Sequence, residues 1–376
     1  MSTLNVEAIS HPTSGSNVTI NGIAPAGTNQ LGNRNKIING DMRIDQRNNG
    51  ASVTSSTAYP VDRWITYGAT DGTYTGQQST DVPTGQGFSN SLKYTVTTAD
   101  ATIGATQYAS IGQRIEGYNT ADLMLGTANA KQFTVSFWVK SSVAGTYGFA
   151  LQNTAGDRGY ATTYSIASTN TWEYKTLVIT GDTTGTWLSD NSIGLRATWG
   201  LGIGSTYTVS ANNTWEAGIK FGAVGATNLM ATLNATIRIT GVQLEAGTVA
   251  TPFERRSYGD ELARCLRYYW LQEVRNATNY GHFCLLASYA TTADVRGFIN
   301  FPVPMRQIPA LSNSDINHFV HLGGPAITAF YIADGGASYY NTGLGVSLSS
   351  AQTGGYASIL RAFNTNNAEL RWDAEL

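Results

Sequence analysis

Strict alternation of hydrophobic and polar positions marks the segment 131–140. Its odd positions carry the hydrophobic side chains of Phe133, Val135, Phe137 and Val139. Successive residues of a strand point to opposite faces of a sheet, so this pattern predicts a strand with one buried face. Seven other strand-like segments are separated by turns rich in Gly, Asn, Asp and Thr: 62–67, 91–97, 107–115, 145–153, 172–180, 192–197 and 236–244. Strands at this spacing predict an all-β domain, an antiparallel β-sandwich, over residues 35–253.

A helical pattern follows this domain. Tyr258, Leu262, Cys265 and Tyr269 recur at alternating spacings of four and three, which is the seam period of a coiled coil. We therefore expect a helix over residues 260–271, within a linker that spans 254–273. Two interpretations remain open, because helices this short are marginal alone: a lone helix packed on a sandwich, and an oligomer seam that forms a trimer.

The two ends of the chain differ in pattern. Residues 274–376 contain further strand-like segments and predict a second small β-sandwich domain: 283–290, 295–301, 326–332, 345–348, 357–363 and 369–372. Residues 1–34 contain two alternating pieces that are too short to build a core. We expect these residues to form an N-terminal attachment arm on another subunit, and the alternative is a loosely packed terminus.

Composition narrows the range of partners. Charged residues make up only 13% of the chain, against roughly 25% in ordinary soluble domains, and 41 glycines contribute to the difference. The net charge of −2 predicts binding to neither nucleic acid nor an anionic membrane surface.

No apolar run approaches the ~20 residues of a membrane span, and the first residues lack the pattern of a signal peptide. We expect Cys265 and Cys284 to be reduced thiols of a protein that folds in a cytoplasm.

A motif lies at the end of the first predicted domain. The segment 241–256 reads Gly-Val-Gln-Leu-Glu-Ala-Gly-Thr-Val-Ala-Thr-Pro-Phe-Glu-Arg-Arg, and residues 265–269 read Cys-Leu-Arg-Tyr-Tyr. Three other segments accompany it: 38–47 (Ile-Asn-Gly-Asp-Met-Arg-Ile-Asp-Gln-Arg), 62–64 (Asp-Arg-Trp) and 301–306 (Phe-Pro-Val-Pro-Met-Arg). Together they resemble a family of tailed-phage and prophage virion structural proteins. The resemblance implies a virion component such as a tail fibre or appendage, assembled in the host cytoplasm.

The order of features within the first domain resembles the jelly roll of family 4/9-like carbohydrate-binding modules. The segment 39–41 (Asn-Gly-Asp) precedes the first strand, 136–139 (Ser-Phe-Trp-Val) lies in the middle, and 236–244 returns beside the first strand. Such modules often hold a structural Ca²⁺, and the resemblance places its ligands at Asn39, Asp41 and Glu245. Alternatively, Asp41 and Glu245 cap turns or pair with arginines. We expect no other cofactor.

Glycan binding needs flat aromatic faces with polar groups beside them. Two predicted loops combine these features, and loops are where binding residues concentrate. The turn 156–160 supplies Asp157, Arg158 and Tyr160. The loop 187–191 supplies Trp187 and two polar partners. Those partners are Asp190 and Asn191. Packing in a sandwich core or at an oligomer interface is the alternative role for each aromatic residue.

The sequence does not predict an enzyme. Four histidines are present, none of them in a recognised triad motif, and no carboxylate pair is specified by spacing. We therefore expect a non-enzymatic tail fibre or receptor-binding appendage that recognises a host surface glycan. A capsid decoration or cement protein is the alternative, and a glycan-degrading hydrolase is the third hypothesis. The few charges leave strand edges poorly protected, which favours a homo-oligomer, and the resemblance implies a trimer.

Overall fold

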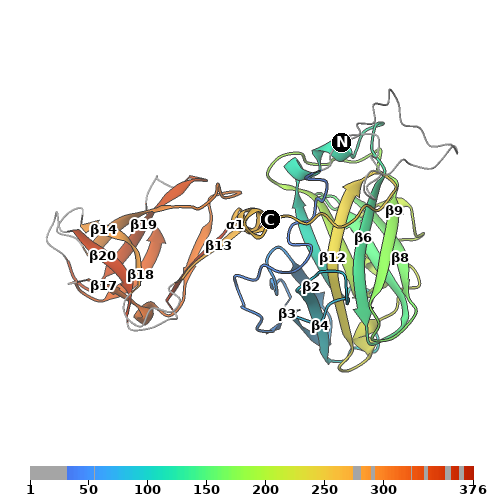
Figure 1. Cartoon of the computed structure of the whole chain (residues 1–376), viewed down its shortest axis with the longest axis horizontal. Helices are drawn as coiled ribbons and strands as arrows, with labels where there is room; N and C mark the ends of the chain where they lie inside the picture. The colour runs from blue at the N-terminus through green and yellow to red at the C-terminus, as the bar shows by residue number, and fades with distance from the viewer. Residues whose placement is uncertain are drawn as a thin grey trace, which may run out of the picture. The chain divides into compact units, whose positions relative to one another are not determined.

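A computed structural model describes residues 32–54, 56–273, 281–288, 293–322, 324–333, 338–351, 357–363 and 368–376. Most of the predicted N-terminal arm therefore lies outside the described residues. The chain divides into two compact units, Met1–Arg256 and Ser257–Leu376. Nearly all regular structure in both units is β, as Figure 1 shows. None of the helices in the described ranges is long and apolar enough to cross a membrane.

The first unit contains two six-stranded antiparallel sheets. The β6 sheet has the order β1-β3-β4-β12-β6-β9. Its strands are β1 (Val53–Thr54), β3 (Thr73–Ser79), β4 (Ser91–Thr98), β12 (Thr236–Ala246), β6 (Phe133–Ser141) and β9 (Glu173–Ile179). The β10 sheet has the order β11-β8-β7-β10-β5-β2. Its strands are β11 (Trp215–Ala217), β8 (Arg158–Ile166), β7 (Gly145–Gln152), β10 (Ile193–Ile203), β5 (Tyr108–Glu116) and β2 (Ile65–Ala69).

Short 3-10 turns occupy several connections: η1 (Gly117–Asn119), η2 (Ala121–Leu123), η3 (Ser205–Tyr207) and η4 (Leu229–Ala231). The inner faces of the two sheets enclose one hydrophobic core. Trp199 of β10 is fully buried, and its ring contacts Trp64 at 5.4 Å and Phe149 at 4.8 Å between centroids. Phe137 of β6 reaches Trp199 from the opposite sheet at 5.6 Å. The prediction of an all-β, jelly-roll-like sandwich is confirmed.

The motif segments 38–47 and 241–256 meet in space and close the sandwich. Gly40 accepts a hydrogen bond from the Val242 amide at 2.9 Å, and a Cβ at Gly40 would lie 2.2 Å from the Val242 carbonyl oxygen. The Lys36 amide donates to the Leu244 carbonyl at 2.8 Å. The Arg256 guanidinium donates to the Asn35 and Ile37 carbonyls. We call this contact between residues 35–43 and 242–256 the terminal clamp.

The second unit begins with a helix, α1 (Tyr258–Leu266), which Ser257 caps by accepting from the Asp260 amide at 3.1 Å. The helix is shorter than predicted. Tyr269 belongs to a strand, β13 (Tyr269–Glu273), because consecutive aromatic residues there pair with β21 (Glu369–Asp373). The predicted seam of Tyr258, Leu262, Cys265 and Tyr269 is therefore not one helical stripe. Tyr258 is exposed, whereas Cys265 and Tyr269 are buried.

Two antiparallel sheets make up the rest of the second unit. The smaller has the order β13-β21-β16, with β16 at Ala310–Asn313. The larger has the order β17-β20-β14-β15-β19-β18. Its strands are β17 (Phe319–His321), β20 (Ala357–Ala362), β14 (His282–Ser288), β15 (Asp294–Asn300), β19 (Asn341–Leu348) and β18 (Ile327–Ile332), with the 3-10 turn η5 (Ile316–His318) before β17. Trp372 is fully buried in their core, and both cysteines are free thiols.

Candidate functional site

The outer face of the β10 sheet is floored by unusually small residues. Along β7 and β10 the large side chains, such as Phe149 and Trp199, point into the core. The alternate positions, which face outward, carry Gly148, Ala150 and Gly200. These residues project little beyond the backbone, so the segment above the sheet approaches it closely: Ala150 packs with Val209 and Ala223 in a small buried cluster.

Beside this cluster lies a cavity of about 720 Å³. Gly148, Gly200 and Gly202 line it from the strands, and the segment 203–228 lines it from above. Asn228 contributes a side-chain oxygen that is buried and has no hydrogen-bond partner within the described part of the chain. Lys220 also lines the cavity, but its ammonium group donates to the Thr206 and Thr208 carbonyls, both at 2.9 Å.

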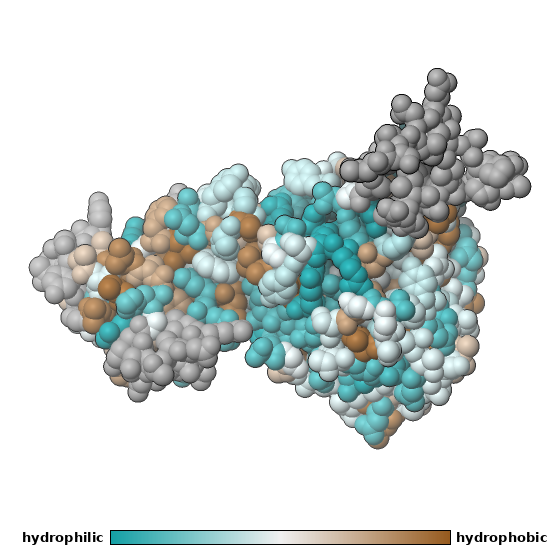
Figure 2. All heavy atoms as spheres, in the orientation of Figure 1, coloured by the Kyte–Doolittle hydropathy of each residue, from teal (hydrophilic) through white to brown (hydrophobic). Residues whose placement is uncertain are grey.

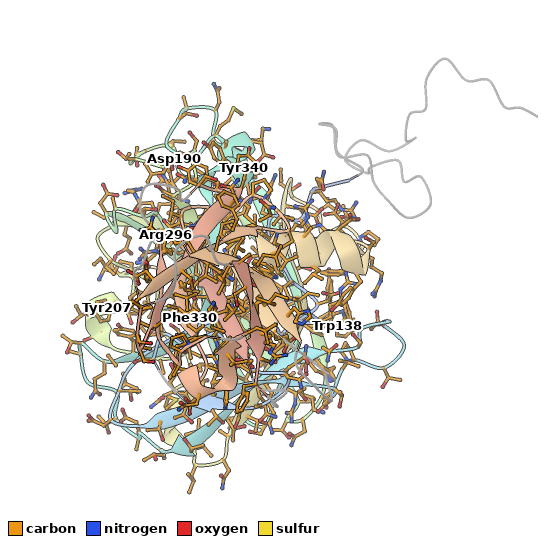
Figure 3. All side chains as sticks on the ribbon, turned by 90° about the vertical axis from the view of Figure 1, so that its left-hand side faces the viewer. Trp138, Asp190, Tyr207, Arg296, Phe330 and Tyr340 are labelled. Carbon is orange, nitrogen blue, oxygen red and sulfur yellow. The ribbon has the colours of Figure 1, made fainter. Side chains whose placement is uncertain are left out.

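Three aromatic rings lie beside the cavity, next to the residues that line it. Tyr207 and Phe221 stack with 4.8 Å between ring centroids, and Tyr108 of β5 meets both rings edge-on. All three side chains are half-buried, so part of each ring faces solvent. Figure 3 shows Tyr207 and Trp138, a residue of β6, on opposite sides of the first unit. Tyr207 therefore lies on a different side of the sandwich from Trp138, which packs against Tyr174 of β9.

A row of polar side chains crosses the same face. Gln152 of β7 lies opposite Arg196 of β10, and Arg196 lies opposite Arg114 of β5. We call these three residues the arginine row. Tyr67 of β2 lies beside it, because Arg114 Nε donates to Tyr67 Oη at 2.6 Å and the Arg114 guanidinium lies 5.3 Å from the Tyr67 ring centroid.

The electrostatics of this row are unusual. Burial lowers the pKa of Arg196, and the neighbouring positive charge of Arg114 acts in the same direction. The Nε of Arg196 and the Nε2 of Gln152 are buried without a hydrogen-bond partner among the described residues. Since buried donors are normally paired, this row has unused capacity to donate hydrogen bonds.

The residues predicted from the loops lie at one end of the β10 sheet, but most are engaged within the protein. Tyr160 belongs to β8 and is only 3% exposed, so the expectation that it lies on an exposed turn is wrong. It faces the core with Tyr164, and its ring lies 5.1 Å from that of Trp215. Arg158 forms an ion pair with buried Asp182. Asp157 bonds to the Asn153 amide group.

The loop 187–191 is more open. Trp187 is half-buried, packs edge-on against Trp215 at 5.3 Å, and donates its indole N–H to the Thr184 carbonyl. Asp190 is exposed and accepts from the Ser192 amide at 2.8 Å, and Asn191 is half-buried. The structure thus joins Tyr160 and Trp187 through Trp215, while Asp190 and Asn191 remain on the surface of the loop.

The residues predicted to bind Ca²⁺ have protein partners. The Asn39 side chain is bonded to the Ile44 backbone and to the Asp62 carbonyl. Asp41 pairs with Arg43 at 3.0 Å. Glu245 accepts from the Thr251 amide at 2.8 Å and from the Thr251 hydroxyl at 2.6 Å. Across the described ranges there is no group of three or more His, Cys, Asp or Glu side chains placed to hold a metal ion.

Sequence reasoning missed the arginine row and the aromatic group. Arg114 and Arg196 do stand at the outward positions of two predicted strands, 107–115 and 192–197, and that was an available signal. Their proximity depends on the register of β5 against β10, which the sequence does not specify. Tyr207 and Phe221 lie in a segment for which no strand or loop motif was predicted.

Neither a scan against models of protein families nor a search of curated proteins finds a match to this sequence. Among solved structures, one similar chain is the enzymatically active domain of tailspike protein 4 of bacteriophage CBA120, at 15% identity and a TM-score of 0.29 over 57% of this chain and 21% of that chain. Another is a putative sugar binding protein from Bacteroides thetaiotaomicron, at 13% identity and a TM-score of 0.33 over 57% of this chain and 100% of that chain.

A third similar structure is the family 11 carbohydrate-binding module of a cellulosomal cellulase of Clostridium thermocellum. Its identity is 13% and its TM-score 0.27, over 54% of this chain and 98% of that chain. At these TM-scores the similarities assign neither a ligand nor a role to this chain.

Proposed function

We propose that this chain is a non-enzymatic structural component of a tailed-phage virion, a tail fibre or receptor-binding appendage that binds host surface glycan through the outer face of the β10 sheet. One observation carries the glycan assignment: three features occur on the same face. They are a cavity lined by glycines, aromatic rings that are partly exposed, and buried polar atoms that have no hydrogen-bond partner among the described residues. Each element matches one requirement of sugar binding.

The cavity of about 720 Å³ gives room for part of a saccharide beside Gly200 and Gly202. Tyr207 and Tyr108 offer ring surface against which the apolar face of a sugar can pack. The Asn228 oxygen accepts hydrogen bonds, and the Gln152 amide donates them. Asn228 lines the cavity and Gln152 lies opposite Arg196, so the two groups would contact different parts of a glycan chain. Binding pockets commonly combine an apolar lining with a few placed polar groups in this way.

The virion assignment rests on the resemblance of the motif segments, which extends over both units. A homo-oligomer is supported by large hydrophobic side chains at the surface of the second unit, where Leu285 is 75% exposed and Phe298 is 61% exposed. Figure 2 shows hydrophobic residues at the surface of this unit. Exposed apolar residues of this kind are commonly covered by a partner. We take the trimer from the resemblance.

A glycan array with the full chain tests the glycan assignment, followed by calorimetric titration of each hit. The informative variant is Tyr207→Ala, for which we expect affinity to fall at least about tenfold, as for an aromatic residue central to an interface. Trp138→Ala is the matched control, because it removes a ring from the opposite face of the same sandwich and should bind as the wild type does. Binding to no glycan, or equal loss in both variants, would refute a site on this face.

The virion assignment needs a separate experiment. Cryo-electron microscopy of purified particles should place this chain at the tail or on a projecting fibre. Regular copies on the capsid shell would instead make it a decoration protein. Release of shortened oligosaccharides from a glycan that binds would contradict the non-enzymatic assignment.

A further inference from the structure

We propose that Arg114 and Arg196 form an oxyanion-binding site, and that the glycan recognised by this face is acidic, carrying a carboxylate or phosphate substituent. This inference rests on the proposed glycan-binding function. It adds the chemical class of the ligand and the residues that select it.

The first argument is geometric. Arg196 and Arg114 are paired directly across β10 and β5, and residues directly opposite in an antiparallel pair have Cβ atoms about 5 Å apart. Both side chains leave the sheet on its outer face, because Leu195 and Ile115 beside them belong to the core. Like charges directly opposite each other on neighbouring strands repel and destabilise a sheet. An anion bound to both guanidinium groups would remove that cost.

The second argument concerns the partners of the two arginines. Tyr67 accepts a hydrogen bond from Arg114 Nε, which orients that guanidinium. The Arg196 side chain makes no hydrogen bond and no ion pair with any residue that the structure describes, and its Nε is buried. The charges that act on Arg196 are those of Tyr67 and Arg114. A half-buried guanidinium with no carboxylate beside it is costly to retain, and an external anion would compensate for its desolvation.

The third argument is chemical. Arginine has five donors and no acceptor, and its planar fork matches the two oxygens of a carboxylate or phosphate. Gln152 completes the row with a buried, unpartnered amide nitrogen on the other side of Arg196. Three adjacent side chains therefore carry hydrogen-bond donors on one face of the sheet. A neutral hydroxyl could accept one of these hydrogen bonds, but only an anion also compensates for the positive charge of Arg196.

Simple oxyanions test the site without knowledge of the glycan. We would label the full chain with ¹⁵N and follow the arginine Nε–Hε resonances while acetate or inorganic phosphate replaces chloride at constant ionic strength. The Nε resonance of Arg196 should shift and saturate with either anion. It should disappear in Arg196→Gln, whereas Arg296→Gln, which changes an exposed arginine of the second unit, should leave the response intact. No saturable shift at Arg196 or Arg114 would overturn the inference.

The second experiment uses the glycans that the wild-type chain retains on the array. These should be predominantly acidic, and Arg196→Gln should bind them about tenfold or more weakly, since one charge-assisted contact is lost. Carboxyl reduction and enzymatic dephosphorylation of the same glycans distinguish the two sources of the anion. Retention of neutral glycans with equal affinity by wild type and Arg196→Gln would overturn the acidic ligand but leave the glycan-binding function intact. An anion response without retention of any glycan would refute the glycan function while keeping the anion site.

Discussion

Arg158 and Asp182 form a two-point ion pair, in which Arg158 Nε donates to Asp182 Oδ2 at 2.6 Å and Arg158 Nη2 donates to Oδ1 at 2.9 Å. The pair links the start of β8 to the loop that leads to Trp187. Hydrogen bonding to Asp182 raises the pKa of Arg158. This arginine is therefore part of the framework of the loop.

Removal of the acid should destabilise the first unit. Asp182 is 2% exposed, and its loss removes both hydrogen bonds to the Arg158 guanidinium, so we expect Asp182→Ala to lower the free energy of unfolding by about 2 kcal/mol. Urea denaturation followed by tryptophan fluorescence would measure this. Asp190→Ala is the control, because Asp190 is exposed in the same loop. Equal midpoints for the two variants would contradict a stabilising role for the pair.

A second prediction concerns pH. Burial raises the pKa of Asp62 to about 6, although Arg47 and the hydrogen bonds from Gln46 oppose the shift. The folded protein then holds a proton that the unfolded chain releases near pH 4, so stability falls as pH rises from about 4 to about 6.

One pKa unit corresponds to about 1.4 kcal/mol, so the titration of Asp62 should lower the free energy of unfolding by about 2 to 3 kcal/mol over this pH range. We expect Asp62→Asn to have a shallower decline of unfolding free energy across this range, measured by denaturation at pH 4.5 and pH 7. Parallel pH profiles for wild type and variant would show that Asp62 titrates normally.

A third prediction addresses the surface of the second unit. Phe298 on β15 is 61% exposed, and we expect Phe298→Ser to reduce the oligomer mass determined by light scattering at a given concentration, because it removes apolar area from the interface. Tyr118→Ser, which changes a residue of the first unit that is 63% exposed, should leave the mass unchanged. A wild-type chain that is monomeric at all concentrations would refute the oligomer.

The fourth prediction concerns calcium. The carboxylate of Glu245 already accepts hydrogen bonds from Thr251 and from Gln243, and Asp41 already pairs with Arg43. We therefore expect EDTA to leave the Tm of the full chain unchanged. A lower Tm that calcium chloride restores, but magnesium chloride does not, would show that these oxygens bind Ca²⁺ as the resemblance implies.

The alternation of large hydrophobic residues was sufficient to predict the sandwich. The predicted segment 131–140 corresponds to β6, where Phe133, Val135, Phe137 and Val139 are all fully buried. The same reasoning overextended the helix, because the spacing of Tyr269 fitted a helical stripe while strand pairing with β21 determined its structure. Local periodicity contains no information about that partner.

The candidate site was harder to predict because it depends on register and on absent side chains. The Gly-Asp sequence at 156–157 indicated a turn, and β8 begins one residue later, so Tyr160 was assigned to the surface instead of the core. The small residues of the floor, such as Ala150 and Gly200, have no distinctive local pattern. Only their alignment across neighbouring strands shows that they form a common surface.

The terminal clamp has a mechanical consequence for the first unit. The chain enters the sandwich near Asn35 and leaves it near Arg256, and these two residues are bonded to each other through the Arg256 guanidinium. The Asn35 amide also donates to Glu254 at 2.8 Å, and Arg43 donates to the Arg256 carbonyl at 2.7 Å. Tension applied along the chain between these points would be borne by a few short cross-links at one place. Apart from the end of β12, which belongs to the clamp, the strands would bear little of this load until the clamp breaks.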